Sequence, residues 1–175
     1  MNRSVKRISI TALGIAMYIV FTAFFRIPFF QNYYLAMGYL VIAVYCYSIG
    51  LPEAVLTGFL GTVLYCLLFN SINGLPGWSL GNALISFCLY QLFQWYKNSK
   101  KGVINTVLAI VAITLITALG IIGIKSVTEV FLYRQPLAVR VFNNSHAFVA
   151  DAVTLYIGFA VAVRTDGIVS RQINR

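Results

Sequence analysis

The residues of this sequence that are best suited to binding or catalysis are the polar and ionisable side chains inside its apolar stretches. The last apolar stretch gathers such side chains on one face. At about 100° per residue, less than half of the helix circumference holds Asn143, His146, Ala147, Asp151 and Thr154. A charged side chain at mid-bilayer costs about 2.5–3.5 kcal/mol on insertion scales, so Asp151 must be paired or hydrated. Two interpretations of Asp151 stay open, a hydrogen bond between helices or the floor of a solvated pocket.

A second polar stripe occupies an earlier apolar stretch, where Asn82, Ser86 and Tyr90 follow each other at intervals of four residues. Such stripes can hydrogen-bond membrane helices together, but Asn82, Asn143 and His146 also share one end of their stretches. The connecting segments at that end are rich in aromatic, amide and guanidinium groups. Because aromatic walls with a few convergent polar groups suit a small, flat, polar ligand, we predict a binding site there. Its candidate residues are Arg26, Gln31, Asn32, Tyr33, Asn73, Trp78, Asn82, Ser86, Arg140, Asn143, His146 and Asp151.

Six apolar runs must position these residues. They cover about 8–25, 34–50, 51–69, 80–96, 103–124 and 141–163, and about 20 residues are needed for each crossing of a bilayer. Of the 13 Lys and Arg residues, nine lie in one set of alternate gaps and four (Arg26, Lys125, Arg134 and Arg140) in the other. This positive-inside bias predicts both termini in the cytoplasm. We expect an all-α bundle of six transmembrane helices forming one domain, residues 1–175, with loops at 26–33, 70–78 and 127–140.

Composition excludes several classes of function. The chain is 60% hydrophobic and 10% charged, and its mean hydropathy is +0.84, which fits lipid as the solvent. The net charge of +9 lies at the ends of the spans, so it sets topology, and we expect no nucleic-acid partner. Cys46, Cys66 and Cys88 are separated and have no ligand-like spacing, so we expect neither a metal nor a cofactor. The sequence has no phosphate-binding GxxxxGK[ST] motif, no HExxH motif and only four acidic residues.

The first span carries a pair of small residues, Ala12 and Ala16, one helical turn apart and flanking Gly14. Small residues at this spacing let another helix approach closely. The pair is therefore a candidate contact surface, either within the bundle or with a partner protein.

With these features the chain resembles the substrate-binding S components of energy-coupling factor (ECF) transporters, the vitamin importers of bacteria and archaea. The resemblance covers nearly the full length and rests on Ala12–Ala16 as an AxxxA motif, on the segment 32–40 and on 77–82 (GWSLGN). It implies a non-enzymatic cell-membrane protein that captures a vitamin at nanomolar-range affinity near the outer face, under the first two external loops. It also implies partners, namely a transmembrane coupling subunit, docked at Ala12 and Ala16, and two cytosolic ATPases that drive uptake.

Alternatives and the ligand stay open at this point. A small intramembrane enzyme acting on a lipid or isoprenoid, or a stand-alone small-solute carrier, would also fit six spans. Three external arginines favour a carboxylate ligand such as pantothenate, folate or nicotinate, because guanidinium pairs with carboxylate through two hydrogen bonds. Asp151 favours instead an amine or ring N–H, as in a pyrimidine or pyridoxine.

Overall fold

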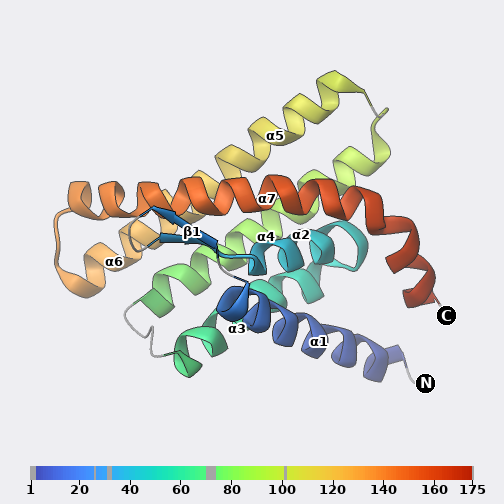
Figure 1. Cartoon of the computed structure of the whole chain (residues 1–175), viewed down its shortest axis with the longest axis horizontal. Helices are drawn as coiled ribbons and strands as arrows, with labels where there is room; N and C mark the ends of the chain where they lie inside the picture. Colours follow the sequence, from blue (N-terminus) through green and yellow to red (C-terminus); the bar gives the residue numbers. More distant parts are fainter. Residues whose placement is uncertain (1–2, 26, 31–32, 70–73, 101, 175) are drawn as a thin grey trace.

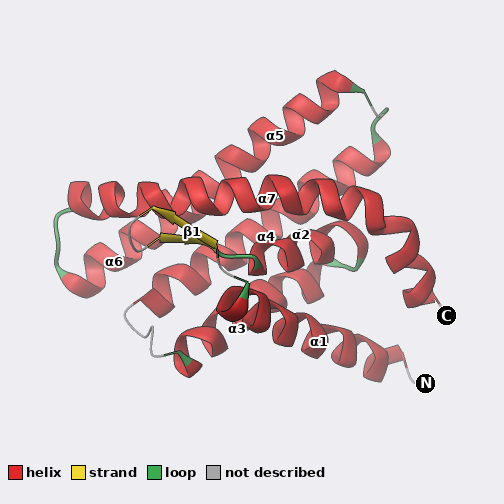
Figure 2. Cartoon of the chain, in the orientation of Figure 1, coloured by secondary structure: helices red, strands yellow, loops and turns green. Residues whose placement is uncertain are grey.

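The computed structural model describes residues 3–25, 27–30, 33–69, 74–100 and 102–174. These residues are helical apart from one short β-hairpin and the connecting turns (Figures 1 and 2), so the all-α prediction is confirmed for the bundle. The elements are α1 (Arg3–Phe24), β1 (Ile27–Phe30), β2 (Tyr33–Leu35), α2 (Gly38–Ser48), α3 (Leu51–Leu68), α4 (Leu75–Asn98), α5 (Val103–Ala118), the π-helix η2 (Leu119–Lys125), α6 (Ser126–Tyr133) and α7 (Leu137–Asn174).

Four helices among the described residues are long and apolar enough to cross a bilayer: Ser4–Phe24, Leu51–Leu68, Val103–Tyr133 and Leu137–Val169. The other two helices differ from them in length or composition. With 24 residues α4 has the length, but it carries more polar side chains. With 11 residues α2 is about 16 Å long at 1.5 Å per residue, roughly half of the hydrocarbon thickness. The count of six spans therefore stays a prediction.

Three expected boundaries are corrected by the structure, one of them at α4, which begins at Leu75, inside the expected loop 70–78. The run expected to be helical from residue 34 begins as strand β2, and α2 starts only at Gly38. There β1 and β2 pair antiparallel, with Ile27 opposite Leu35, so backbone pairing replaces the expected loop. The segment 127–140 is likewise helical rather than a loop, because α5, η2 and α6 continue one another and the chain turns only at Arg134, whose φ of 51° is left-handed.

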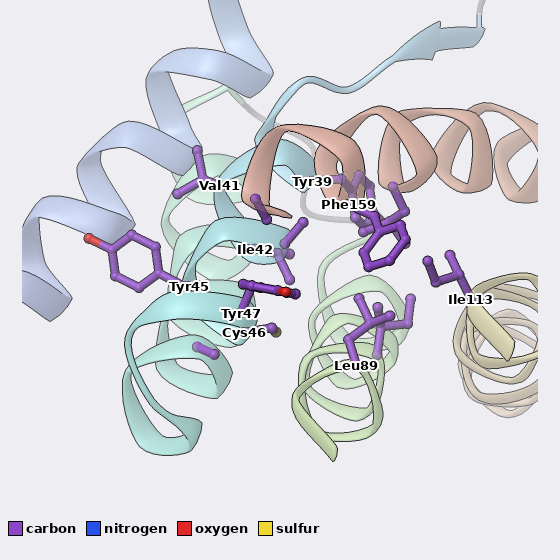
Figure 3. Close-up of a cluster of buried hydrophobic side chains, with 14 of the residues drawn as sticks. Tyr39, Val41, Ile42, Tyr45, Cys46, Tyr47, Leu89, Ile113 and Phe159 are labelled. Carbon is purple, nitrogen blue, oxygen red and sulfur yellow. The ribbon is translucent and has the colours of Figure 1, made fainter. Parts of the chain in front are cut away.

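The short helix α2 forms the middle of the bundle, packed between α1, α4 and α7 (Figure 3). Glycines allow the closest approaches between the helices. A Cβ on Gly158 of α7 would lie 2.8 Å from the Cβ of Ala43 on α2. Similarly, a Cβ on Gly81 of α4 would lie 2.7 Å from the carbonyl oxygen of Gly120 in η2. Both glycines are therefore required by helix packing, not by backbone conformation.

The two chain termini lie at the same end of the molecule (Figure 1). Ionic contacts hold the helices together there. The ammonium of Lys97 on α4 lies 2.8 Å from the Asp166 carboxylate on α7, which also accepts a hydrogen bond from Ser48 of α2. We call this the terminal end of the bundle, and the end that carries the hairpin and the turn between α6 and α7 the loop end. The predicted substrate site belongs to the loop end.

Candidate substrate-binding site

The hydroxyl group of Tyr39, at the start of α2, is the centre of a buried polar network. It accepts a hydrogen bond from the indole N–H of Trp78 over 3.0 Å. It lies 2.8 Å from Oδ1 of Asn82 and 2.9 Å from Oδ2 of Asp151, to either of which it can donate its single proton. Tyr39 therefore joins α4 and α7 through α2, and both candidate residues Asn82 and Asp151 meet at one atom.

The same network continues from Asn82 toward α1 and α3. Its amide nitrogen donates to the hydroxyl of Tyr18 over 3.0 Å and to that of Thr62 over 2.7 Å. The two hydroxyls are 3.0 Å apart, and Tyr18, Thr62 and Asn82 are fully buried. Because buried polar groups are costly when unpaired, this network specifies how α1, α2, α3, α4 and α7 fit together.

Asp151 is 6% exposed, and among the described residues its carboxylate accepts a hydrogen bond from the neutral hydroxyl of Tyr39. No salt bridge to this carboxylate occurs within the described part of the chain. A carboxyl group offers about four lone pairs on two oxygens, and Tyr39 uses one of them. Asp151 thus combines the helix-bridging role with unused hydrogen-bonding capacity, so both interpretations drawn from the sequence remain compatible with it.

An aromatic cluster lies beside the network at the loop end. The Tyr65 ring meets the Trp78 ring edge-on, with centroids 5.6 Å apart, and stacks on Phe69 at 5.1 Å. Tyr65 is buried whereas Phe69 is exposed. Aromatic faces and edges with this spacing offer a flat ligand ring both stacking surfaces and edge contacts.

A second polar cluster ties α6 and α7 together nearer their connecting turn. The amide of Asn144 donates to the Ser126 hydroxyl and to Oε2 of Glu129, each over 3.0 Å. Arg140 approaches the same Glu129 oxygen at 3.5 Å and lies over the Tyr133 ring. Arg140 is therefore already engaged with a buried carboxylate, and the argument for a carboxylate ligand loses one of its three arginines.

The other predicted site residues are distributed as follows. Asn143 was expected to face the interior, but it is exposed and its neighbour Asn144 is buried instead, because the inward face of α7 is centred on Asp151. His146 is half-buried, with its ring 5.4 Å from that of Phe142. Ser86 is fully buried one turn from Asn82, where its Oγ packs against Gly58. Lying outside the described residues are Arg26, Gln31, Asn32 and Asn73, together with the side chain of Tyr33.

Ala12 and Ala16 are exposed on α1, as a contact surface for another protein requires. Gly14, between the two alanines, instead faces the neighbouring helices, where a Cβ would meet Tyr45 of α2 and Thr57 of α3. Ala12 also borders a hollow beside α3, and neither alanine is buried within the described residues.

Sequence reasoning missed three residues of the network, namely Tyr18, Tyr39 and Thr62. Each lies in an apolar run, where tyrosine is easily interpreted as an aromatic hydrophobe. The available signal was the hydroxyl group itself, since a buried tyrosine usually finds a hydrogen-bond partner.

A family model described as "ECF-type riboflavin transporter, S component" matches residues 2–165. The chain belongs to this family. The resemblance to ECF S components seen in the sequence is thereby confirmed, and the protein is a component of a vitamin transporter in a membrane. No curated protein and no solved structure matches the chain.

Membership of the ECF-type riboflavin transporter S component family changes the ligand question. The family is one of transporters rather than enzymes, so the intramembrane enzyme is not favoured. Its description names riboflavin, which is none of the vitamins considered from the sequence. Membrane coupling subunits and ATPases are the kind of partner with which ECF S components work.

Proposed function

We propose that this protein is the riboflavin-binding S component of an ECF-type importer, which captures the vitamin at the loop end of the bundle. The observation that carries the proposal is the family match over residues 2–165. In this proposal residues 1–175 form one domain with six spans and both termini in the cytoplasm of a bacterium or archaeon. A coupling subunit and two cytosolic ATPases supply the energy for uptake.

The chemistry of the loop end supports a flavin. The isoalloxazine ring of riboflavin is flat and aromatic, and its pyrimidine edge carries a ring N–H between two carbonyl groups. The aromatic cluster of Tyr65, Phe69 and Trp78 offers it stacking surfaces. Asp151 offers an acceptor for the ring N–H, and the indole N–H of Trp78 offers a donor for a carbonyl group once it leaves the Tyr39 hydroxyl. Among the candidates drawn from the sequence, this edge matches the pyrimidine-type ligand that Asp151 favoured.

Trp78 is the residue of the polar network that a ligand would reach first. It is the half-buried member, whereas Tyr39 and Asn82 are fully buried behind it. A flavin edge that replaces the indole N–H at the Tyr39 hydroxyl gains access to the whole network without unpacking the helices. The candidate residues on the first two external segments then cover the ring from outside.

The partner interface is proposed at the exposed pair Ala12 and Ala16 on α1. Small side chains there leave room for a helix of the coupling subunit to approach the α1 backbone. This surface lies at the middle of α1 on its exposed side, so it is separate from the buried polar network and can be altered independently.

Uptake in a riboflavin auxotroph tests the function. Cells that express the chain together with a coupling subunit and two ATPases should grow on low riboflavin and accumulate labelled riboflavin. Omission of the ATPases should abolish accumulation, because the chain has no nucleotide-binding motif of its own. Accumulation without the ATPases would support the stand-alone carrier instead.

A further inference from the structure

An apolar groove of about 670 Å³ runs along α1 on the side away from α3. Its wall on α1 extends from Lys6 through Leu13 to Phe21, about 22 Å at 1.5 Å per residue. Val44 and Tyr45 of α2 form the floor, and Val161 of α7 contributes to the far wall. In Figure 3 the side chain of Tyr45 points from α2 toward α1.

Apart from Lys6, the polar side chains that line the groove already donate hydrogen bonds within the chain. The Tyr45 hydroxyl donates to the Ile10 carbonyl over 2.7 Å, and the Ser9 hydroxyl donates to the Val5 carbonyl within α1. Water in such a groove would find few partners, so an apolar occupant is favoured. The groove is open along its length, and it belongs to a membrane transporter component, so it faces the acyl chains of the bilayer.

Positive charge marks the terminal end of the groove. Lys6 is the charged residue among those that line it. Arg164 is exposed on α7, one turn before the lining residue Ile168. Ammonium and guanidinium groups at the membrane surface attract anionic headgroups. The groove therefore offers charge at one end and about 22 Å of apolar wall beyond it.

From this combination we infer that the groove binds one anionic phospholipid, with its phosphate at Lys6 and one acyl chain along α1, α2 and α7. The length of the wall exceeds one leaflet, half of the roughly 30 Å hydrocarbon core, so it can hold a whole chain. The inference does not depend on which vitamin the protein binds.

A lipid fits this groove better than a helix of the coupling subunit does. The small residues that allow close helix approach, Ala12 and Ala16, are not among its lining residues. Ala12 instead borders a separate hollow of about 530 Å³ between α1 and α3, with Thr11, Pro52 and Leu56. The groove and the proposed docking surface are therefore neighbours on α1 but not the same surface.

Native mass spectrometry of the purified chain tests the inference. The protein is exchanged into mixed micelles that contain phosphatidylglycerol and phosphatidylcholine with identical acyl chains, and the retained lipids are counted. Wild type should retain one phosphatidylglycerol, preferred over phosphatidylcholine by roughly fivefold for one basic side chain. Lys6→Gln should abolish the preference, whereas Lys100→Gln, at an exposed lysine of the turn between α4 and α5, should keep it.

A second pair of variants tests the groove itself. Leu13→Trp fills it and should remove the retained lipid of either kind, whereas Leu115→Trp, on the exposed face of α5, should not. Equal retention of both lipids by wild type, or equal effects of the two members in either pair, would show annular lipid only and overturn the inference. Loss of coupling-subunit binding in Leu13→Trp with lipid retention intact would also overturn it, because the groove would then be a protein interface.

Discussion

Replacing Tyr39 by phenylalanine removes one hydroxyl group and leaves the ring that packs in the core. The hydroxyl accepts from Trp78 and donates to Asp151 or Asn82, so two hydrogen bonds are lost. At the average of about 0.6 kcal/mol measured for such bonds in membrane proteins, the loss is about 1.2 kcal/mol. Leaving the buried partners unsatisfied raises the cost to as much as about 3 kcal/mol. We therefore expect Tyr39→Phe to lower the free energy of unfolding by about 1–3 kcal/mol.

A matched control, Tyr45, lies six residues further along the same helix. The Tyr45 hydroxyl makes one hydrogen bond, to the Ile10 carbonyl, so Tyr45→Phe should cost about 0.6 kcal/mol. Reversible unfolding in detergent, followed by helical circular dichroism, measures both variants. Tyr39→Phe should also change the fluorescence of Trp78, because the indole N–H loses its acceptor, whereas Tyr45→Phe should not.

The reasoning about the network would be refuted by a simple result. If Tyr39→Phe is no more destabilising than Tyr45→Phe and leaves the tryptophan emission unchanged, the Tyr39 hydroxyl does not organise the three helices. Asp151 and Asn82 would then need other partners, and the site would have to be placed elsewhere.

Three further outcomes are expected. Asp151→Asn should weaken riboflavin binding by roughly 10- to 150-fold, the value of a charge-assisted hydrogen bond of about 1.5–3 kcal/mol. The control Asp166→Asn, on the same helix, should leave the affinity unchanged. Wild-type affinity in titrations of Asp151→Asn would make Asp151 purely structural. Ala12→Trp should abolish uptake but preserve vitamin binding to the isolated chain, and normal uptake would remove the docking assignment. Gly81→Ala should destabilise by about 1–3 kcal/mol, because its Cβ would meet a backbone carbonyl at 2.7 Å, while Gly74→Ala, with open space around it, should be neutral in the same melts.

The sequence predicted the all-α fold because apolar runs of span length are a strong physical signal. The sequence was less informative about element boundaries, where local composition and contacts with distant residues favour different structures. The run from residue 34 looked like a span by composition, but its first residues pair with β1 in a hairpin. The segment 127–140 carries Glu129, Arg134 and Pro136, which suggested a loop, yet Glu129 is buried and bonded to Asn144 within a helical pair.

The binding site was predicted only in part, because the sequence shows the spacing of residues along one helix but not which helices meet. Spacing alone identified Asn82 and Asp151, and the structure brings both to the Tyr39 hydroxyl. The prediction chose Asn143 as the inward-facing amide of α7, whereas Asn144 is the buried one. A rotation of the helix by one residue is enough to change which amide faces the neighbouring helix. Tyr39 was missed because its role depends on helices that are distant in sequence, and no local pattern reports that.

Titration of the purified protein with riboflavin tests the central claim most directly. Removal of any co-purified flavin by partial unfolding and refolding in detergent precedes the titration, and quenching of flavin fluorescence reports binding. We predict one riboflavin per chain with a Kd on the order of nanomolar, about −12 kcal/mol, and no competition by pantothenate, folate, nicotinate or pyridoxine. Failure of riboflavin to bind, with tight binding of one of those four vitamins instead, would contradict the claim.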